Sequence, residues 1–147
     1  MWPDSYPGIA TITKPGGASV PNDAPKLNMN RPPIAVIGLG YVGLPLAVEF
    51  AKVRPVIGFD IDEKRVRQLA GGYDRTGETT KDELAEAVGL SLVSSADRLA
   101  DCTTFIVTVP TPIDSHRRPN LKPLLSASAT VAQYLKAGDL VVYESTV

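Results

Sequence analysis

The chain has 147 residues, of which 44% are hydrophobic and 21% are charged, as in an ordinary globular domain with a buried core. Its formal net charge of −1 gives no electrostatic reason to bind nucleic acid or an anionic membrane. One cysteine excludes an internal disulfide, no apolar run approaches the ~20 residues of a membrane span, and no signal-peptide pattern opens the chain, so we expect a cytoplasmic protein.

The first 31 residues differ in composition from the rest of the chain. Seven of the thirteen prolines lie in the first 33 positions, together with Gly8, Gly16 and Gly17, and no helical or strand period is present. Such a segment buries too little apolar surface to order itself. We therefore expect a flexible, disordered tail over residues 1–31 and a single folded domain over residues 32–147.

A glycine-rich turn joins the first predicted strand to the first predicted helix. The apolar run Ile34–Ile37 leads directly into Gly38-Leu39-Gly40-Tyr41-Val42-Gly43, and apolar residues then recur with helical spacing from Leu44 to about Lys52. In such a turn the three glycines permit a sharp exit from the strand, close approach of a pyrophosphate and tight packing of the helix. The helix N-terminus directs its N–H groups at the phosphates. The alternative is a glycine-rich turn without a ligand.

The second predicted strand, Val56–Phe59, ends at Asp60, which lies 17 residues after Gly43. A carboxylate at this position can accept hydrogen bonds from both hydroxyls of an adenosine ribose and repels a 2′-phosphate. The pattern therefore favours NAD over NADP as the cofactor. A solvated acid at a strand end is the alternative.

Capping residues mark the next two helices. Asp62 can cap a helix that runs to about Ala70, and Thr80 with Glu83 forms a capping box for a short helix predicted to close at Gly89. The charges of the first of these helices are predicted to lie mostly on an exposed face. They are Glu63, Lys64, Arg65 and Arg67.

Three more strands are predicted over Leu90–Val93, residues 105–109 and Leu140–Tyr143, with a short helical turn capped by Ser95 after the first of them. A long helix precedes Gly138. Its predicted core-facing side comprises Leu121, Leu124, Leu125, Ser128, Val131, Ala132 and Leu135. The alternation of strands and helices predicts an α/β fold with a Rossmann-type, doubly wound parallel sheet.

Four motifs in this order resemble those of the UDP-glucose/GDP-mannose dehydrogenase family. They are the glycine turn, Gly58-Phe59-Asp60, Val109-Pro110-Thr111-Pro112 and Glu144-Ser145-Thr146-Val147, and the resemblance covers residues 34–147. Residues 75–80, 119–124 and 142–147 further resemble the UDP-N-acetylhexosamine 6-dehydrogenases. That branch makes N-acetylhexosaminuronic acid precursors for O-antigen and Vi-type capsule polysaccharides.

The resemblance implies NAD as the cofactor, no metal, and a role for each matching residue. The glycine turn would hold the pyrophosphate, and Asp60 the adenosine ribose with Arg65 beside it. The nicotinamide side would be lined by Thr108, Val109, Pro110 and Thr111. Ser145 would contact the cofactor, and Thr146 would have a supporting catalytic role in orienting water. From spacing alone, residues 109–112 could equally form an ordinary turn, and the two hydroxyls could cap a helix.

The family reaction oxidises the C6 alcohol of a nucleotide sugar to a carboxylate with two NAD⁺, through a cysteine thiolate aided by a lysine and an asparagine. The resemblance places these residues, the central helix and the UDP-binding domain beyond residue 147. Cys102 precedes the fourth strand, matches no catalytic position and is interpreted as structural. His116, Arg117 and Arg118 are interpreted as a solvated loop, with a diphosphate contact as the alternative.

We therefore expect the chain alone to bind NAD but not to catalyse. The substrate of the parent would be a UDP-N-acetylhexosamine and the parent a homo-oligomer, while the oligomeric state of this chain stays open. Two other interpretations remain: a domain of the 6-phosphogluconate or β-hydroxyacid dehydrogenase group, and a non-catalytic NAD-binding module or truncated remnant. An exposed apolar patch would distinguish a domain separated from its second half.

Overall fold

The computed structural model describes residues 26–113 and 115–144. Five strands form one parallel sheet in the order β3-β2-β1-β4-β5. The strands are β1 (Ile34–Ile37), β2 (Val56–Phe59), β3 (Leu90–Val93), β4 (Thr104–Val107) and β5 (Leu140–Tyr143). Since β4 returns to pair with β1 on the side opposite β2, the strand order reverses there, and the predicted doubly wound sheet is confirmed.

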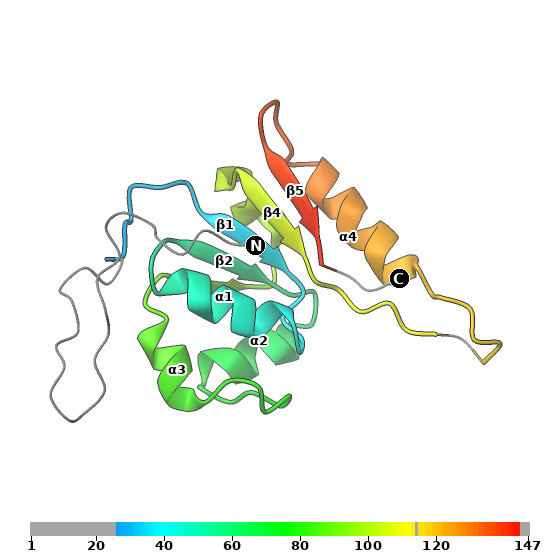
Figure 1. Ribbon diagram of the computed structural model, residues 1–147, viewed down its shortest axis with the longest axis horizontal. Coiled ribbons are helices and arrows are strands. Elements are labelled where there is room, and N and C mark those ends of the chain that lie inside the picture. The colour runs from blue at the N-terminus through cyan, green and yellow to red at the C-terminus, as the bar shows by residue number, and fades with distance from the viewer. Residues whose placement is uncertain (1–25, 114, 145–147) are drawn as a thin grey trace, which may run out of the picture.

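Helices cover both faces of the sheet (Figure 1). Three of them pack on one face, and the 3₁₀ helix and the long helix pack on the other. The first group is α1 (Gly43–Ala51), α2 (Glu63–Ala70) and α3 (Lys81–Glu86); the second is η1 (Ala96–Asp101) and α4 (Lys122–Ala132).

The central strand β1 contributes to both cores. Ile34 and Val36 pack with α1, whereas Ala35 and Ile37 pack with η1 and α4, and all four are buried. A strand covered on both faces has no polar side, which is why its sequence is a continuous apolar run. The glycine turn therefore begins at the buried carboxyl end of β1.

Three predicted helix starts are confirmed, but the predicted side-chain cap of one of them is absent. Asp62 accepts hydrogen bonds from the N–H groups of Lys64 and Arg65 at the start of α2, and the capping box of Thr80 and Glu83 opens α3. Ser95 does not cap η1, because its hydroxyl donates to Asp97 Oδ2 instead. The short helix α3 also ends at Glu86, before the predicted stop at Gly89.

The fourth strand is shorter than predicted, ending at Val107 instead of residue 109. Thr108 still donates its N–H to the Ile37 carbonyl (2.9 Å), but Pro110 has no N–H and restricts the backbone of Val109. The chain therefore leaves the sheet at the carboxyl edge, where β1 and β2 also end.

The predicted core-facing side of α4 is wrong in part. Leu121, Leu125, Ala132 and Leu135 are exposed, and the buried residues of the helix are Ala127 and Val131. The prediction merged two neighbouring stripes of the helix, because a run rich in leucine and alanine has a weak apolar period. Only the narrower stripe faces β4.

The segment before β1 contacts the domain. Asn28 donates its N–H to the Val53 carbonyl (3.0 Å), and Arg54 Nη2 donates to the Pro32 carbonyl (2.6 Å). Contacts with the domain therefore begin before residue 32. The remainder of the predicted tail, residues 1–25, lies outside the described residues.

Candidate functional site

The glycine turn leaves β1 in a conformation that only glycine adopts readily. Gly38 has φ = +96°, and its N–H donates to the Phe59 carbonyl at 2.8 Å, which ties the turn to the end of β2. A Cβ at Gly43 would overlap the Gly38 carbonyl oxygen and Thr108 Oγ1. A Cβ at Gly40 would meet no atom within 4 Å, so open space lies beside that backbone. Gly38 and Gly43 therefore have the turn and packing roles that the sequence predicted, and the pyrophosphate contact at Gly40 stays a prediction.

The N-terminus of α1 opens onto the same space. No side chain caps the helix at Val42, and its first turn carries no acidic residue. Within residues 26–113 and 115–144, no acceptor pairs with the N–H groups of Gly40, Tyr41, Val42 or Gly43. Unpaired N–H groups and the positive end of the helix dipole together favour an anion at this point.

Thr108 holds the glycine turn from the β4 side. Its side chain is buried, and its hydroxyl lies 2.7 Å from the Gly38 carbonyl oxygen and 3.0 Å from that of Ile37. The sequence predicted only that Thr108 lines the nicotinamide side. The structure adds a role that the sequence analysis missed, since nothing in the local pattern indicates a bond to a residue 70 positions away.

Asp60 holds the turn from the β2 side. Its Oδ2 accepts the N–H of Leu39 and its Oδ1 accepts the N–H of Asp62, both at 2.9 Å. The carboxylate is partly buried and fixed in orientation by these two bonds. An ionised carboxylate has about four lone-pair sites, so roughly two remain for the hydroxyls of a ligand.

Arg65 is buried, and its predicted place on an exposed helix face is wrong. Only 1% of the residue is exposed; its Nε donates to the Leu39 carbonyl at 2.8 Å, and its Nη2 forms an ion pair with Asp74 at 2.7 Å. Its Nη1 is buried with no hydrogen-bond partner among the described residues. Arg65 shares the buried face of α2 with Leu69, four residues later, and its side chain reaches beneath the glycine turn to a carboxylate in another loop.

Asp74 is the main site residue that the sequence analysis missed. It accepts the backbone N–H groups of Thr76, Glu78 and Thr79 as well as the hydroxyl of Thr76. Burial acts to raise its pKa, but these hydrogen bonds and Arg65 outweigh burial and lower the pKa to about 2. An aspartate two residues before a threonine is typical of such a turn, although that signal does not identify Arg65 as the partner.

The remaining predicted site residues divide into two groups. Val109, Pro110 and Thr111 follow β4 at the same edge of the sheet, and the Val109 backbone lies against Gly38. Ser145 and Thr146 lie outside the described residues, so their predicted roles stay predictions. The structure thus brings the glycine turn, Asp60, Arg65 and Thr108 together around one backbone segment.

Comparison with known proteins shows where this arrangement recurs. Residues 32–147 match the model of the UDP-glucose/GDP-mannose dehydrogenase family, NAD binding domain. The chain belongs to this family. It is 54% identical over 114 residues to the UDP-N-acetyl-D-glucosamine 6-dehydrogenase of Salmonella typhi. This alignment covers 78% of the chain and 27% of that protein. It is also 50% identical over 119 residues to protein CapL of Staphylococcus aureus, in an alignment that covers 81% of the chain and 28% of CapL.

A solved structure of a UDP-sugar dehydrogenase has the same fold over the matched region. The UDP-D-ManNAc dehydrogenase of Pyrococcus horikoshii superimposes with a TM-score of 0.73 at 33% sequence identity, over 78% of this chain and 28% of that one. The chain therefore spans about a quarter of the length of the curated relatives that it matches. The family match favours the predicted family over the 6-phosphogluconate and β-hydroxyacid dehydrogenase group.

The residues present fit the NAD of this family on two observations. Open space lies over Gly40, and the N–H groups at the start of α1 have no acceptor among the described residues. These features supply room and donors for a diphosphate. In the described part of the chain, no group of three or more histidine, cysteine, aspartate or glutamate side chains could hold a metal ion.

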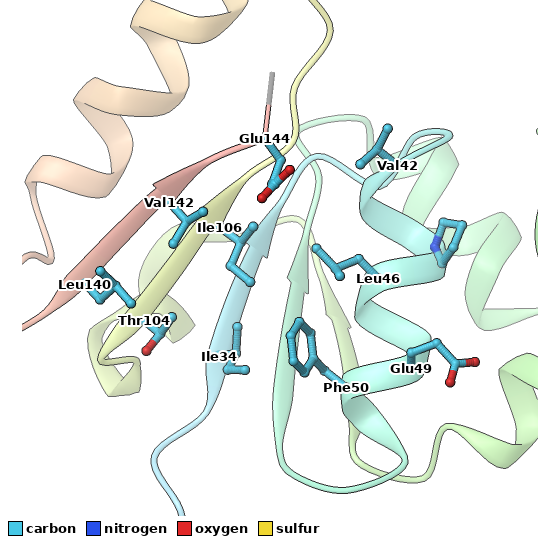
Figure 2. Close-up of a pocket in the computed structure, with 11 residues that line it drawn as sticks. Ile34, Val42, Leu46, Glu49, Phe50, Thr104, Ile106, Leu140, Val142 and Glu144 are labelled. Atoms are coloured by element: carbon cyan, nitrogen blue, oxygen red, sulfur yellow. The ribbon is translucent and has the colours of Figure 1, made fainter. Parts of the chain in front are cut away.

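A groove of about 690 Å³ lies on the α1 face of the sheet, between α1 and β5 (Figure 2). Leu46 and Phe50 approach it from α1, and Ile106 and Val142 from the sheet. Its charged groups are acidic and it contains no cation, so it does not suit a diphosphate. It is lined by Ile34, Val42, Pro45, Leu46, Glu49, Phe50, Thr104, Ile106, Leu140, Val142 and Glu144.

Two further observations concern residues away from the turn. Cys102 is fully buried before β4, at the end of the strand opposite the glycine turn, and burial raises the pKa of its thiol to about 12, so it is a poor nucleophile. None of the helices in the described residues has the length and hydropathy to cross a bilayer.

Proposed function

We propose that this domain binds NAD across the carboxyl edge of its sheet. The pyrophosphate lies over residues 38–43, the adenosine ribose hydrogen-bonds Asp60 with Arg65 beside the adenosine, and the nicotinamide lies toward residues 108–111 and Ser145. The observation that carries the proposal is the Leu39 backbone, which Asp60 holds at its N–H and Arg65 at its carbonyl. This support fixes the glycine turn in a shape in which the N–H groups of residues 40–43 have no acceptor among the described residues and can bind phosphate.

Asp60 is the residue that favours NAD over NADP. Its carboxylate is fixed by the N–H groups of Leu39 and Asp62, so it cannot turn away from a ribose bound beside it. Its charge attracts the donor hydroxyls of NAD and repels the 2′-phosphate of NADP.

The reaction that we propose for the parent protein is oxidation of the C6 alcohol of a UDP-N-acetylhexosamine to a carboxylate, with two NAD⁺ and for surface polysaccharide synthesis. The names of the most similar relatives support it: UDP-N-acetyl-D-glucosamine 6-dehydrogenases of Salmonella typhi and Pseudomonas aeruginosa, at 54% and 55% identity. When bound, NAD⁺ would supply the hydride acceptor, and the residues of this chain would bind and orient it.

Residues 1–147 by themselves are proposed to bind NAD without oxidising the sugar. The described part of the chain contains one cysteine, and it is buried with a raised pKa, so it cannot capture an aldehyde. Thr146 is proposed only to support catalysis by orienting water. The division into a tail (residues 1–31) and an NAD-binding domain (residues 32–147) belongs to the same proposal.

Isothermal titration of the purified chain with NAD⁺ and NADP⁺ tests the binding proposal. We expect saturable binding of NAD⁺, weaker binding of NADP⁺, and a loss of about tenfold in NAD⁺ affinity for Asp60→Asn. Binding of NADP⁺ equal to or tighter than NAD⁺ would contradict the role of Asp60.

A chimera tests whether this domain can serve as the cofactor half of the proposed reaction. Residues 32–147 replace the matching quarter of the Salmonella typhi relative, and NADH formation is measured with UDP-N-acetyl-D-glucosamine and with UDP-glucose. We expect two NADH per UDP-N-acetyl-D-glucosamine consumed. NADH formation by the 147-residue chain alone, from either sugar, would refute the proposal that it does not catalyse.

A further inference from the structure

Both arginines that border the Asp60 side of the site are paired with carboxylates. Arg65 forms its ion pair with Asp74, and Arg75 Nη1 donates to Asp62 Oδ2 at 3.1 Å. Together with Asp60, this corner of the domain holds three aspartates and two arginines. The excess charge there is therefore negative.

The Arg65 pair differs from the Arg75 pair in burial. The side chains of Arg65 and Asp74 are 1% and 0% exposed, whereas those of Arg75 and Asp62 are 49% and 41% exposed. A surface pair contributes little and exchanges readily with solvent, while a buried pair fixes the position of both groups. Asp74 thus decides where the guanidinium of Arg65 lies.

Asp74 is itself held rigidly before it meets Arg65. Three backbone N–H groups and the hydroxyl of Thr76 converge on its two oxygens, so the carboxylate belongs to the folded turn of residues 74–79. Arg65 in turn donates to the Leu39 carbonyl, one residue away from the open backbone of Gly40. A chain of contacts therefore runs from the turn of residues 74–79 through Arg65 to the glycine turn.

We propose that Asp74 is a specificity-positioning residue for the cofactor: by holding Arg65 beneath the glycine turn, it keeps that guanidinium away from the ribose hydroxyls that Asp60 receives. An arginine in that region is the side chain with which dinucleotide-binding sites accept a 2′-phosphate, because its planar donors match phosphate oxygens. Preference for NAD then has two sources, the charge of Asp60 and the sequestration of Arg65. The inference rests on the proposed binding of NAD.

The test measures dissociation constants of NAD⁺ and NADP⁺ for Asp74→Asn, which keeps the shape of the side chain and removes its charge. We expect NAD⁺ binding to weaken about fivefold and the NADP⁺/NAD⁺ ratio of dissociation constants to fall about tenfold, since Arg65 loses its partner and reaches solvent. An unchanged ratio in a variant that folds like the wild type would overturn the proposal, because a merely structural role would weaken both cofactors alike.

Two further variants isolate the cause. In Arg65→Met/Asp74→Asn the guanidinium is absent, so the ratio should return to that of Arg65→Met alone; a ratio as low as that of Asp74→Asn would show that Arg65 is not responsible. Thr76→Val removes one hydroxyl bond to Asp74 but leaves the ion pair, and it should keep the wild-type ratio. A tenfold fall in Thr76→Val would assign the effect to the turn and overturn the role of the charge.

If Asp74→Asn does not fold, Asp74→Glu carries the same test, because the longer carboxylate displaces the guanidinium while keeping it paired. We then expect the NADP⁺/NAD⁺ ratio of dissociation constants to fall at least about threefold. An unchanged ratio would again overturn the proposal. Failure of the wild-type chain to bind NAD⁺ would instead contradict the proposed function, so the two failures are distinguishable.

Discussion

Thr108 and Gly38 are joined by a partly buried hydrogen bond of 2.7 Å between the ends of two neighbouring strands, although they lie 70 positions apart in the chain. The bond links the end of β4 to the first residue of the glycine turn. Asp60 and Arg65 hold the next residue of the turn from the β2 side. The turn is therefore clamped on both sides, and its shape before the cofactor arrives is set by tertiary contacts as much as by its glycines.

Replacement of Thr108 by valine tests the β4 side of this clamp. Valine keeps the volume but removes the donor, which leaves the Gly38 carbonyl without its side-chain partner. We expect a loss of about 1–2 kcal/mol in the free energy of unfolding, measured by urea denaturation, and weaker NAD⁺ binding. Thr108→Ser, which keeps the hydroxyl, is the matched control. Equal NAD⁺ affinity in the valine and serine variants would show that the bond does not shape the binding site.

Two glycines of the same turn should respond in opposite ways to alanine. At Gly43 the new Cβ would overlap the Gly38 carbonyl oxygen and Thr108 Oγ1, so we expect Gly43→Ala to lower the free energy of unfolding by at least about 2 kcal/mol. At Gly40 the Cβ enters open space, so Gly40→Ala should leave the melting temperature nearly unchanged.

The same Gly40→Ala variant should nevertheless bind NAD⁺ at least about tenfold more weakly, because the methyl group occupies the space over the turn. Calorimetry and titration of the two variants separate the structural glycine from the binding glycine. Undiminished NAD⁺ binding by a stable Gly40→Ala variant would mean that the pyrophosphate does not lie over this residue.

The stability of the domain should depend on pH through Asp74. Its pKa is lowered from 3.8 to about 2 in the folded chain, so the ionised group stabilises the fold above pH 4, and this contribution is lost as the pH falls through 2. A shift of this size corresponds to roughly 2 kcal/mol. Denaturant unfolding between pH 5 and pH 2 should therefore show a smaller decline for Asp74→Asn than for the wild type. Parallel declines would mean that Asp74 titrates normally in the fold.

The sequence predicts the features of this fold and site that depend on residues close together in the chain, and it fails where the contacting residues are far apart. The five strands, the cap at Asp62 and the capping box at Thr80 follow local rules and were predictable. The burial of Arg65 was not, because its partner Asp74 lies in a separate turn and a charged residue at a helical surface position normally faces solvent. The exposed leucines in and beside α4 were misassigned for a related reason, because the neighbouring elements decide which face of a helix is covered.

The groove between α1 and β5 gives the last prediction. Leu140 lines it and is 56% exposed, and an exposed apolar face of this kind binds hydrophobic molecules, so the chain should bind a hydrophobic dye and associate as its concentration rises. Leu140→Asp should reduce the dye fluorescence by roughly half and lower the association measured by sedimentation, since it places a charge at the edge of the patch. Leu125 on α4 is 65% exposed but lies outside the groove, so Leu125→Asp is the matched control and should have a smaller effect. A wild-type chain that binds no dye and stays monomeric would instead favour a self-sufficient NAD-binding module, because the groove would then have to be covered by the chain itself.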